Sequence, residues 1–363
     1  MFTIYSIIPS LENKIGHFFE YNRAFSEAAK INQWKCIKII PKDCEIGLLS
    51  SDWVKKLYKM DPQKKLKNLR NFLPFFKIIK KLKKEKKPVL FMEDFNIQTL
   101  ILVFICVLLL RPKIKFWLLH RFEYDVMILK GKISLFFSYL IEFCIGKNNM
   151  TYMTDSTLIA KRNGYLFKRK FYVLPIPHTE FMNNNRSRKK EILLWWPGGL
   201  IREEKGLSTI IELSNLLKNS NLPIKLIIAE NSKDKININD KIHLVSSFLT
   251  REEYYTLMSK ADLILLPYQK QNYRYRTSGI FVEAIVAGAI PITSNNTWMA
   301  TELSKYNLEE LIINWDNKNL LDILMKIHIS NTIEEKIKKM KTDYKDFHNI
   351  KNFAKILKKI SRL

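Results

Sequence analysis

The sequence predicts an α/β protein made of two doubly wound domains, each a parallel sheet with helices on both faces. Two observations carry this prediction. Short apolar strand signals alternate with helix signals along both halves, and a polar, turn-prone run at residues 183–190 separates the halves. With 363 residues, of which 47% are hydrophobic, the chain can bury a core in each domain.

The first half alternates from its N-terminus, with breaks at Pro41, Pro88 and Pro112. The predicted strands are residues 3–9, 35–40, 89–92 and 114–119, and the predicted helices are 16–30 and 100–110. The helix at 100–110 is uninterruptedly apolar but shorter than the roughly 20 residues that span a bilayer. We expect it to be buried between strands, with shallow insertion into one leaflet as the alternative.

The second half restarts the alternation. The predicted strands are residues 191–196, 224–229, 242–245, 263–267 and 290–293, and the predicted helices are 206–219, 251–261 and 279–287. The expected organisation is a first domain at 1–180, a linker at 181–190, a second domain at 191–340, and a basic helix at 341–363 that packs back on the first domain.

The chain is strongly basic, with 61 Lys and Arg against 35 Asp and Glu and a formal net charge of +26. Such a charge favours a polyanionic partner, although a Lys-rich genome composition would also produce it. Residues 53–87 hold fourteen of the cations and only two acids.

Helical spacing after Pro74 places four apolar residues of this basic stretch on one face and the lysines on the others. The four are Phe75, Ile78, Ile79 and Leu82. This pattern is typical of a cationic helix in an anionic lipid headgroup region. The alternative is that the apolar face packs on the first domain and the lysines are only solvated.

The four cysteines show no CxxC spacing and no neighbouring histidines. They are Cys36, Cys44, Cys106 and Cys144. We expect no metal and no disulfide, which suits the reducing cytoplasm. The N-terminus lacks the charged start and cleavage site of a signal peptide.

Three loops at predicted strand ends are candidate ligand sites, because open parallel sheets bind ligands there. The first ends at Gly16, where a helix N-terminus favours negative charge, although a simple tight turn has the same pattern. The second, residues 196–206, carries a glycine pair, Arg202 and Lys205. Lys205 suits a diphosphate, and an exposed loop lysine is the alternative.

The third loop is rich in Arg and Tyr and leads into a helix that starts at Thr277-Ser278-Gly279. Glu283 follows about one turn later on an otherwise apolar helix. A buried acid needs hydrogen-bond donors, which a ribose diol supplies.

The second and third loops resemble the C-terminal domain of GT-B glycosyltransferases of the family 4 type, a group with bacterial mannosyl- and glucosyltransferases. The family's G…KG loop is matched from Gly199 to Gly206, and its SG…EA…G…P helix from Ser278 to Pro291. The resemblance covers most of residues 110–315. It implies the GT-B architecture, in which two Rossmann-like doubly wound domains face each other across a cleft.

The resemblance also implies a donor site. His120 looks like the family's histidine that approaches the donor sugar, although it could also be a satisfied polar residue at a domain edge. The expected catalytic residues are His120, Lys205 and Arg276. The expected donor-binding residues are Gly16, Gly199, Arg202, Lys205, Thr277, Ser278, Gly279, Ile280 and Glu283.

Two positions depart from the family pattern. Tyr275 stands where the family has a first glutamate, eight residues before Glu283, so the sugar contacts of that glutamate are not carried over. Leu200 and Gly199 stand where the family has an arginine before the lysine, and either Arg202 or Arg276 could supply that charge.

The implied reaction moves a hexosyl group from a nucleotide-diphosphate sugar to an acceptor hydroxyl, with retention and without metal or cofactor. The acceptor would sit on the first domain, in lipopolysaccharide, capsule or lipid-linked glycan synthesis at the inner face of the membrane. The alternatives are a GT-B-fold sugar-nucleotide epimerase, or a non-enzymatic basic protein that binds membrane or nucleic acid. No zinc finger, helix-turn-helix or RNP-like motif supports nucleic acid.

Overall fold

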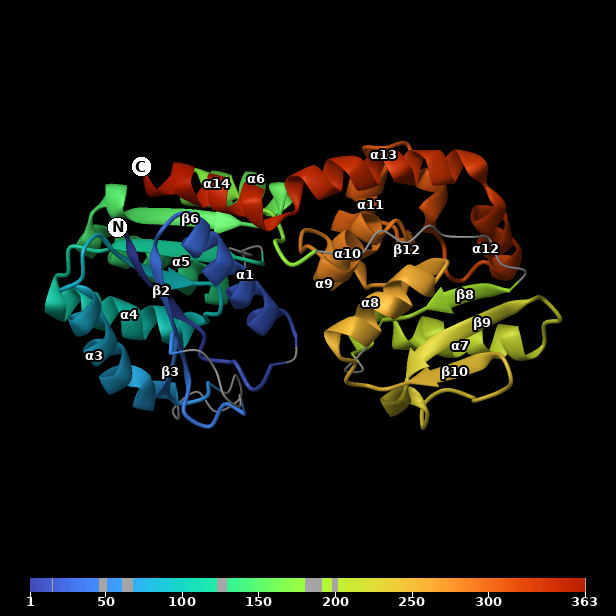
Figure 1. The fold of residues 1–363 in the computed structure, drawn as a ribbon, viewed down its shortest axis with the longest axis horizontal. Coiled ribbons are helices and arrows are strands. Elements are labelled where there is room, and N and C mark those ends of the chain that lie inside the picture. The colour runs from blue at the N-terminus through green and yellow to red at the C-terminus, as the bar shows by residue number, and fades with distance from the viewer. Residues whose placement is uncertain are drawn as a thin grey trace. The chain divides into compact units, whose positions relative to one another are not determined.

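The computed structural model describes residues 1–14, 16–45, 51–60, 68–122, 129–179, 191–197 and 202–362. These residues form two compact units (Figure 1). Unit 1 comprises Met1–His178 and Asn349–Leu363, and unit 2 comprises Thr179–His348. The predicted linker at 181–190 lies outside the described residues.

Unit 1 contains a seven-stranded sheet in the order β3-β2-β1-β4-β5-β6-β7. All described pairings in it are parallel. Its strands are β1 (Thr3–Ile7), β2 (Lys35–Pro41), β3 (Trp53–Leu57), β4 (Pro88–Met92), β5 (Lys115–His120), β6 (Met150–Thr154) and β7 (Phe171–Val173). Its helices are α1 (His17–Ile31), α3 (Phe72–Leu82), α4 (Ile97–Leu110), α5 (Leu129–Ile145), α6 (Thr157–Phe167) and α14 (Ile350–Ser361).

Unit 2 contains a six-stranded parallel sheet in the order β10-β9-β8-β11-β12-β13. Its strands are β8 (Ile192–Trp195), β9 (Ile224–Ala229), β10 (Ile242–Val245), β11 (Leu263–Leu266), β12 (Ile290–Ser294) and β13 (Ile312–Ile313). Its helices are α7 (Leu207–Lys218), α8 (Arg251–Lys260), α9 (Lys270–Tyr273), α10 (Gly279–Ala287), α11 (Trp298–Ser304), α12 (Leu320–Ile329) and α13 (Asn331–Phe347).

The strand order confirms the predicted pair of Rossmann-like, doubly wound sheets. In each sheet the order reverses at one point, between β1 and β4 in unit 1 and between β8 and β11 in unit 2. Crossover connections leave this point in opposite directions, so the loops after the strands diverge and expose the strand ends to a ligand. These are the positions that matter for function.

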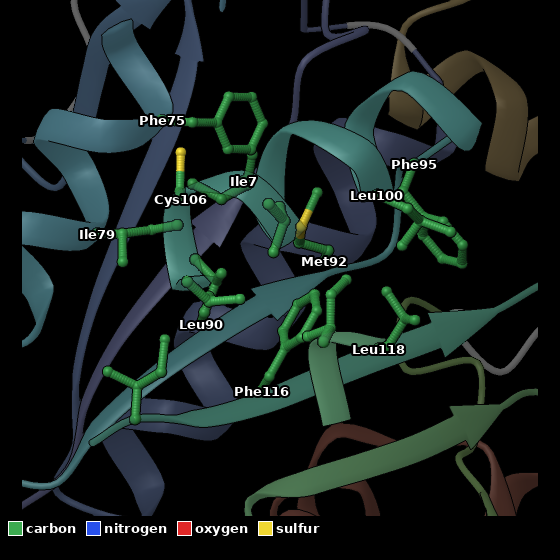
Figure 2. Packing of buried hydrophobic residues seen from close by; sticks show 14 of the residues in the cluster. Ile7, Phe75, Ile79, Leu90, Met92, Phe95, Leu100, Cys106, Phe116 and Leu118 are labelled. Carbon is green, nitrogen blue, oxygen red and sulfur yellow. The ribbon is translucent and has the colours of Figure 1, made fainter. Parts of the chain in front are cut away.

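Alternate side chains of the unit 1 strands enter two separate cores. Ile4 of β1 faces α1 and α14, whereas Tyr5 and Ile7 face the layer formed by α3, α4 and α5. Figure 2 shows this second core, where residues of α3 and α4 point toward those of β4 and β5. The labelled members are Ile7, Phe75, Ile79, Leu90, Met92, Phe95, Leu100, Cys106, Phe116 and Leu118.

Helix α3 corrects one expectation. Its apolar face, which the sequence suggested for lipid, is buried in the core: Phe75, Ile79 and Leu82 are 0% exposed and Ile78 is 3% exposed. An amphipathic pattern indicates only that one face of the helix is shielded from water, and in this protein the sheet covers that face. Helix α4 starts at an Asn96 capping box and ends at Arg111, whose left-handed conformation stops the helix. Among the described residues, no helix is long and apolar enough to cross a membrane.

The C-terminal segment predicted at 341–363 spans the end of α13 and all of α14. Helix α14 belongs to unit 1, although it follows unit 2 in the chain. It packs on α1, where the ring of Phe353 lies 5.8 Å from Phe25 and the Asn32 amide donates to the Ala354 carbonyl at 2.8 Å. Figure 1 shows this red helix among the elements of unit 1.

Candidate functional site

The second and third candidate loops meet at the strand-order reversal of unit 2. The loop after β8 ends in a 3-10 turn, Glu203–Lys205, and the loop after β11 leads through α9 to the start of α10. Two hydrogen bonds fix the turn. The Trp196 indole donates to the Lys205 carbonyl at 3.2 Å, and the Gln269 amide donates to the Glu204 carbonyl at 3.0 Å. The turn at Glu203–Lys205 is therefore fixed by residues that follow β8 and β11.

Gly206 allows the two loops to approach closely. Its φ is +83°, and a Cβ placed on it would lie 2.2 Å from the Pro267 carbonyl oxygen and 2.7 Å from that ring's Cγ. No other residue fits this position without moving the loops, since L side chains disfavour such a φ and the contact leaves no room. The glycine thus fixes Lys205 at the carboxyl end of β11.

Lys205 is half-buried and lies in a positively charged environment. Burial, with the nearby charges of Arg202 and Arg276, lowers the pKa of its ammonium to about 8, although Glu204 opposes the shift. The amine lies 6.0 Å from the centre of the Tyr268 ring. A lysine next to two arginines loses affinity for its proton because like charges repel, and an anion at this place would relieve that repulsion.

Aromatic rings hold the arginine of the third loop. The Arg276 guanidinium lies 5.4 Å from the ring of Tyr273, which in turn lies 4.4 Å from the ring of Tyr268. Arg202 is 46% exposed and makes one long ion pair, at 3.8 Å, with Glu204. Three cations thus gather around one carboxylate, and the excess charge suits a dianion such as a diphosphate.

The N-terminus of α10 lies at the same place. The Ser278 hydroxyl accepts a hydrogen bond from the Phe281 amide at 3.2 Å and caps the helix. Ser278 and Thr277 are buried, and Ile280 is half-buried. The structure brings Lys205, Arg276 and this helix start together. Helix N-terminal amides attract phosphate oxygens.

Glu283 lies one turn into α10 and is 9% exposed. The Tyr254 hydroxyl donates to its Oε2 at 2.6 Å, which orients the carboxylate. Burial, and then the charge of Glu283, raise the pKa of Tyr254 well above its usual value, so the phenol keeps its proton. The sequence did not indicate Tyr254, because its position on α8 relates it to Glu283 only through the fold.

Two other predicted residues lie elsewhere or outside the described chain. Gly199 falls among residues that the structure does not describe. Gly16 lies in unit 1 at the start of α1, with φ +94° and no atom within 4 Å of a Cβ placed on it. This φ requires glycine, and the open space leaves the helix start accessible.

His120 ends β5 as expected, but its side chain is 0% exposed. It is surrounded by aromatic rings, with Phe171 at 5.1 Å and Phe95 at 5.2 Å between ring centres. Burial lowers the pKa of the imidazole to about 3, so it is neutral at pH 7. A direct role on a sugar therefore requires the ring to become accessible, and the prediction for His120 remains untested.

The sequence reasoning missed an ionic cluster at the strand ends of unit 1. The Arg121 guanidinium pairs with Glu93 at 2.7 Å and lies 4.0 Å from Asp155. Burial raises the pKa of Glu93 to about 8, although Arg121 opposes the shift. Asp94 accepts two hydrogen bonds from Ser10 and ties the loop after β1 to the end of β4. The sequence did contain a signal for this cluster, because two acids, Glu93 and Asp94, directly follow the predicted strand at 89–92.

The described residues contain no group of three His, Cys, Asp or Glu side chains that could hold a metal ion. The expectations of no metal and no cofactor remain predictions.

Comparisons with known proteins support the fold. No protein-family model and no curated protein sequence matches the chain. Sucrose-phosphate synthase from Thermosynechococcus elongatus is similar in structure, with a TM-score of 0.71 and 14% identity over 99% of this chain and 98% of that one. A UDP-forming trehalose-phosphate synthase from Burkholderia xenovorans has a TM-score of 0.66 and 10% identity over 100% and 99%.

An alpha-glucosyltransferase in complex with UDP-glucose and DNA is similar as well, with a TM-score of 0.58 and 11% identity over 100% of this chain and 99% of that one. The matches cover whole chains rather than single domains. The protein therefore has the GT-B glycosyltransferase fold.

Proposed function

We propose that the protein is a glycosyltransferase that moves a sugar from a nucleoside-diphosphate donor to an acceptor hydroxyl. The observation that carries this proposal is the group of three cations around the α10 N-terminus in unit 2. Lys205, Arg202 and Arg276 converge there, and among the described residues Glu204 is the acid that opposes their effect on Lys205. A multiply charged anion would relieve such repulsion between neighbouring cations, so the site is suited to one.

The residues divide into a diphosphate part and a nucleoside part. Lys205, Arg276 and the amides at the start of α10 would hold the diphosphate and stabilise its charge as it leaves the sugar. Glu283, oriented by Tyr254, would accept the hydroxyl protons of the ribose. Because such a site needs no carboxylate-bound cation, we expect metal-independent transfer. Uridine is the first base to test, since similar structures include complexes with UDP and UDP-glucose.

The finer aspects of the proposal rest on the family resemblance. These are a hexosyl donor, retention at the anomeric carbon, an acceptor on unit 1, and lipopolysaccharide, capsule or lipid-linked glycan synthesis at the cytoplasmic face of the membrane.

The experiment combines a donor screen with two substitutions. Bound donor stabilises the folded state by RT ln(1 + [L]/Kd), so a shift in melting temperature identifies the nucleotide sugar. Lys205→Ala and Glu283→Ala should each weaken donor binding or turnover at least about tenfold, or about 1.4 kcal/mol. Lys270→Ala is the matched control, because it removes an exposed lysine from the same loop region. Folded variants with unchanged kinetics would refute the assignment, and inverted or epimerised donor without glycosylated product would indicate an epimerase.

A further inference from the structure

The outer face of α4 is apolar although it faces solvent. Residues 100–110 contain no polar side chain, so the helix has no hydrophilic face to turn outward. Its inner side fills the core, while Leu108 and Leu109 are 45% and 62% exposed and Phe104 and Ile105 are half-buried. A helix that is apolar on all sides is normally covered on all sides.

Helix α5 extends this apolar surface. Phe136 and Phe143 are seven residues apart, which places them on one stripe of the helix, and they are 56% and 88% exposed. The two helices are neighbours, since the rings of Phe104 and Phe137 lie 5.8 Å apart. Burial raises the pKa of the Cys144 thiol near the end of α5, and the charge of Arg111, just after α4, partly opposes this shift, so the two helices end close together.

Cations border this surface. The Lys83 amine donates to the Leu110 carbonyl at 3.2 Å and joins the end of α3 to the end of α4. In residues 69–113 and 131–149, every exposed charged residue that the structure describes is a cation. These are Arg70, Lys77, Lys80, Lys81, Lys83, Lys84, Lys86, Lys87, Arg111, Lys113, Lys132 and Lys147. The carboxylates of the same residues are buried or half-buried.

We infer that the outer face of α4 and α5, with the cations of α3, is a docking surface for an anionic phospholipid bilayer. The aromatic and aliphatic side chains would enter the headgroup region, and the lysines would meet the lipid phosphates. The absence of exposed acid among the described residues of this surface favours lipid over a protein partner of mixed charge. For α4 this is the alternative that the sequence left open, shallow insertion of residues 100–110 into one leaflet, whereas α3 supplies cations and not the apolar part.

Only the role of this docking, which is to bring the enzyme to a lipid-linked acceptor, rests on the proposed function. The docking itself is independent of donor binding, since all its residues lie in unit 1 and the cation cluster lies in unit 2.

The experiment is flotation with vesicles of phosphatidylcholine alone or mixed with phosphatidylglycerol. The wild-type protein should float with the mixed vesicles, and salt should weaken this binding by screening. Phe143→Ser with Leu109→Ser should reduce partition at least about tenfold, because both side chains would leave the lipid. Phe143→Trp should retain binding, because Trp favours the membrane interface.

A matched pair tests the apolar part. Phe248 and Ile329 of unit 2 are 58% and 60% exposed, so replacing both by Ser removes exposed apolar area of the same kind elsewhere. That variant should bind like the wild-type protein.

A second matched pair tests the charges. Lys80→Gln with Lys84→Gln should weaken partition at least about tenfold. Lys355→Gln with Lys359→Gln makes the same change in net charge at the same spacing, on helix α14, which covers the opposite face of the same sheet. Equal losses in both variants would mean binding by overall charge and would overturn the inference.

Three further outcomes are decisive. Failure of the wild-type protein to float would overturn the inference. A dimer in lipid-free solution that Phe143→Ser converts to a monomer, seen by light scattering, would show that this face binds a second copy. Donor-induced thermal stabilisation, measured without lipid, separates the two proposals: its absence refutes the function, whereas lost flotation with intact stabilisation refutes only the docking surface.

Discussion

Replacing Gly206 by Ala should destabilise unit 2 much more than the same replacement at Gly288. The two glycines have nearly the same backbone conformation, φ +83° and +79°, and lie in the same unit. A Cβ at Gly288 would meet the end of the Lys341 side chain at 3.0 Å, which can move aside. A Cβ at Gly206 would meet the Pro267 carbonyl at 2.2 Å, which cannot move without the loop.

The magnitudes follow from these contacts. Left-handed backbone costs an alanine about 1–2 kcal/mol at either position. Overpacking adds about 1–3 kcal/mol at Gly206 alone. We therefore expect a loss of about 1–2 kcal/mol for Gly288→Ala and about 2–5 kcal/mol for Gly206→Ala.

Urea denaturation followed by tryptophan fluorescence measures both values in the same transition, provided that the m-value is unchanged. Because the strain at Gly206 displaces Lys205, donor affinity should fall in Gly206→Ala and not in Gly288→Ala. Equal destabilisation by the two variants would show that Pro267 moves aside easily, and the argument that Gly206 fixes Lys205 would then fail.

The remaining predictions concern single side chains. Donor affinity should decrease as the pH rises through about 8, where the Lys205 ammonium loses its proton, and titration calorimetry of Lys205→Arg should show no such decrease because a guanidinium stays charged. Arg276→Lys should lower kcat appreciably, since an ammonium does not reproduce a bidentate phosphate contact; normal turnover would point to Arg202. The folded-state pKa of His120, about 3, lies below its unfolded value, so its contribution to stability is complete above about pH 6.5 and is lost as the pH falls. When the pH is lowered from 7 to 5, the free energy of unfolding of His120→Phe should therefore fall by about 2 kcal/mol less than that of the wild-type protein, as measured by denaturant titrations.

Many of the strands could be predicted because a strand inside a covered parallel sheet is buried on both faces and forms a continuous apolar run. Residues 263–267 are such a run, and the first four of them form β11. Strands β3, β6, β7 and β13 were not predicted. The role of α3 could not be predicted, because an amphipathic helix has the same pattern whether a sheet or a lipid surface covers its apolar face. Only the fold shows that the sheet covers it and that α4 and α5 turn apolar residues outward.

The candidate site shows a similar limit. The rule that ligands bind at strand ends identified both His120 and Lys205, but it does not state which way a side chain points. Strand alternation does: Phe116, Leu118 and His120 share one face of β5, and the first two enter the core beneath α4. The histidine follows them into aromatic surroundings, and Arg121 takes the opposite side.

The same strand order gives the two units opposite electrostatic sites. At the reversal point of unit 1, Glu93 and Asp94 follow β4 and Arg121 is already paired with Glu93. At the reversal point of unit 2, Arg202 and Arg276 add positive charge near Lys205, and Glu204 opposes it. A diphosphate entering unit 1 would compete with Glu93 for Arg121, whereas in unit 2 it would relieve existing repulsion. Topology therefore supplies two equivalent places for a ligand, and under the proposed function the charges favour the second for the nucleotide and leave the hydrogen-bonding carboxyl groups of the first for the acceptor.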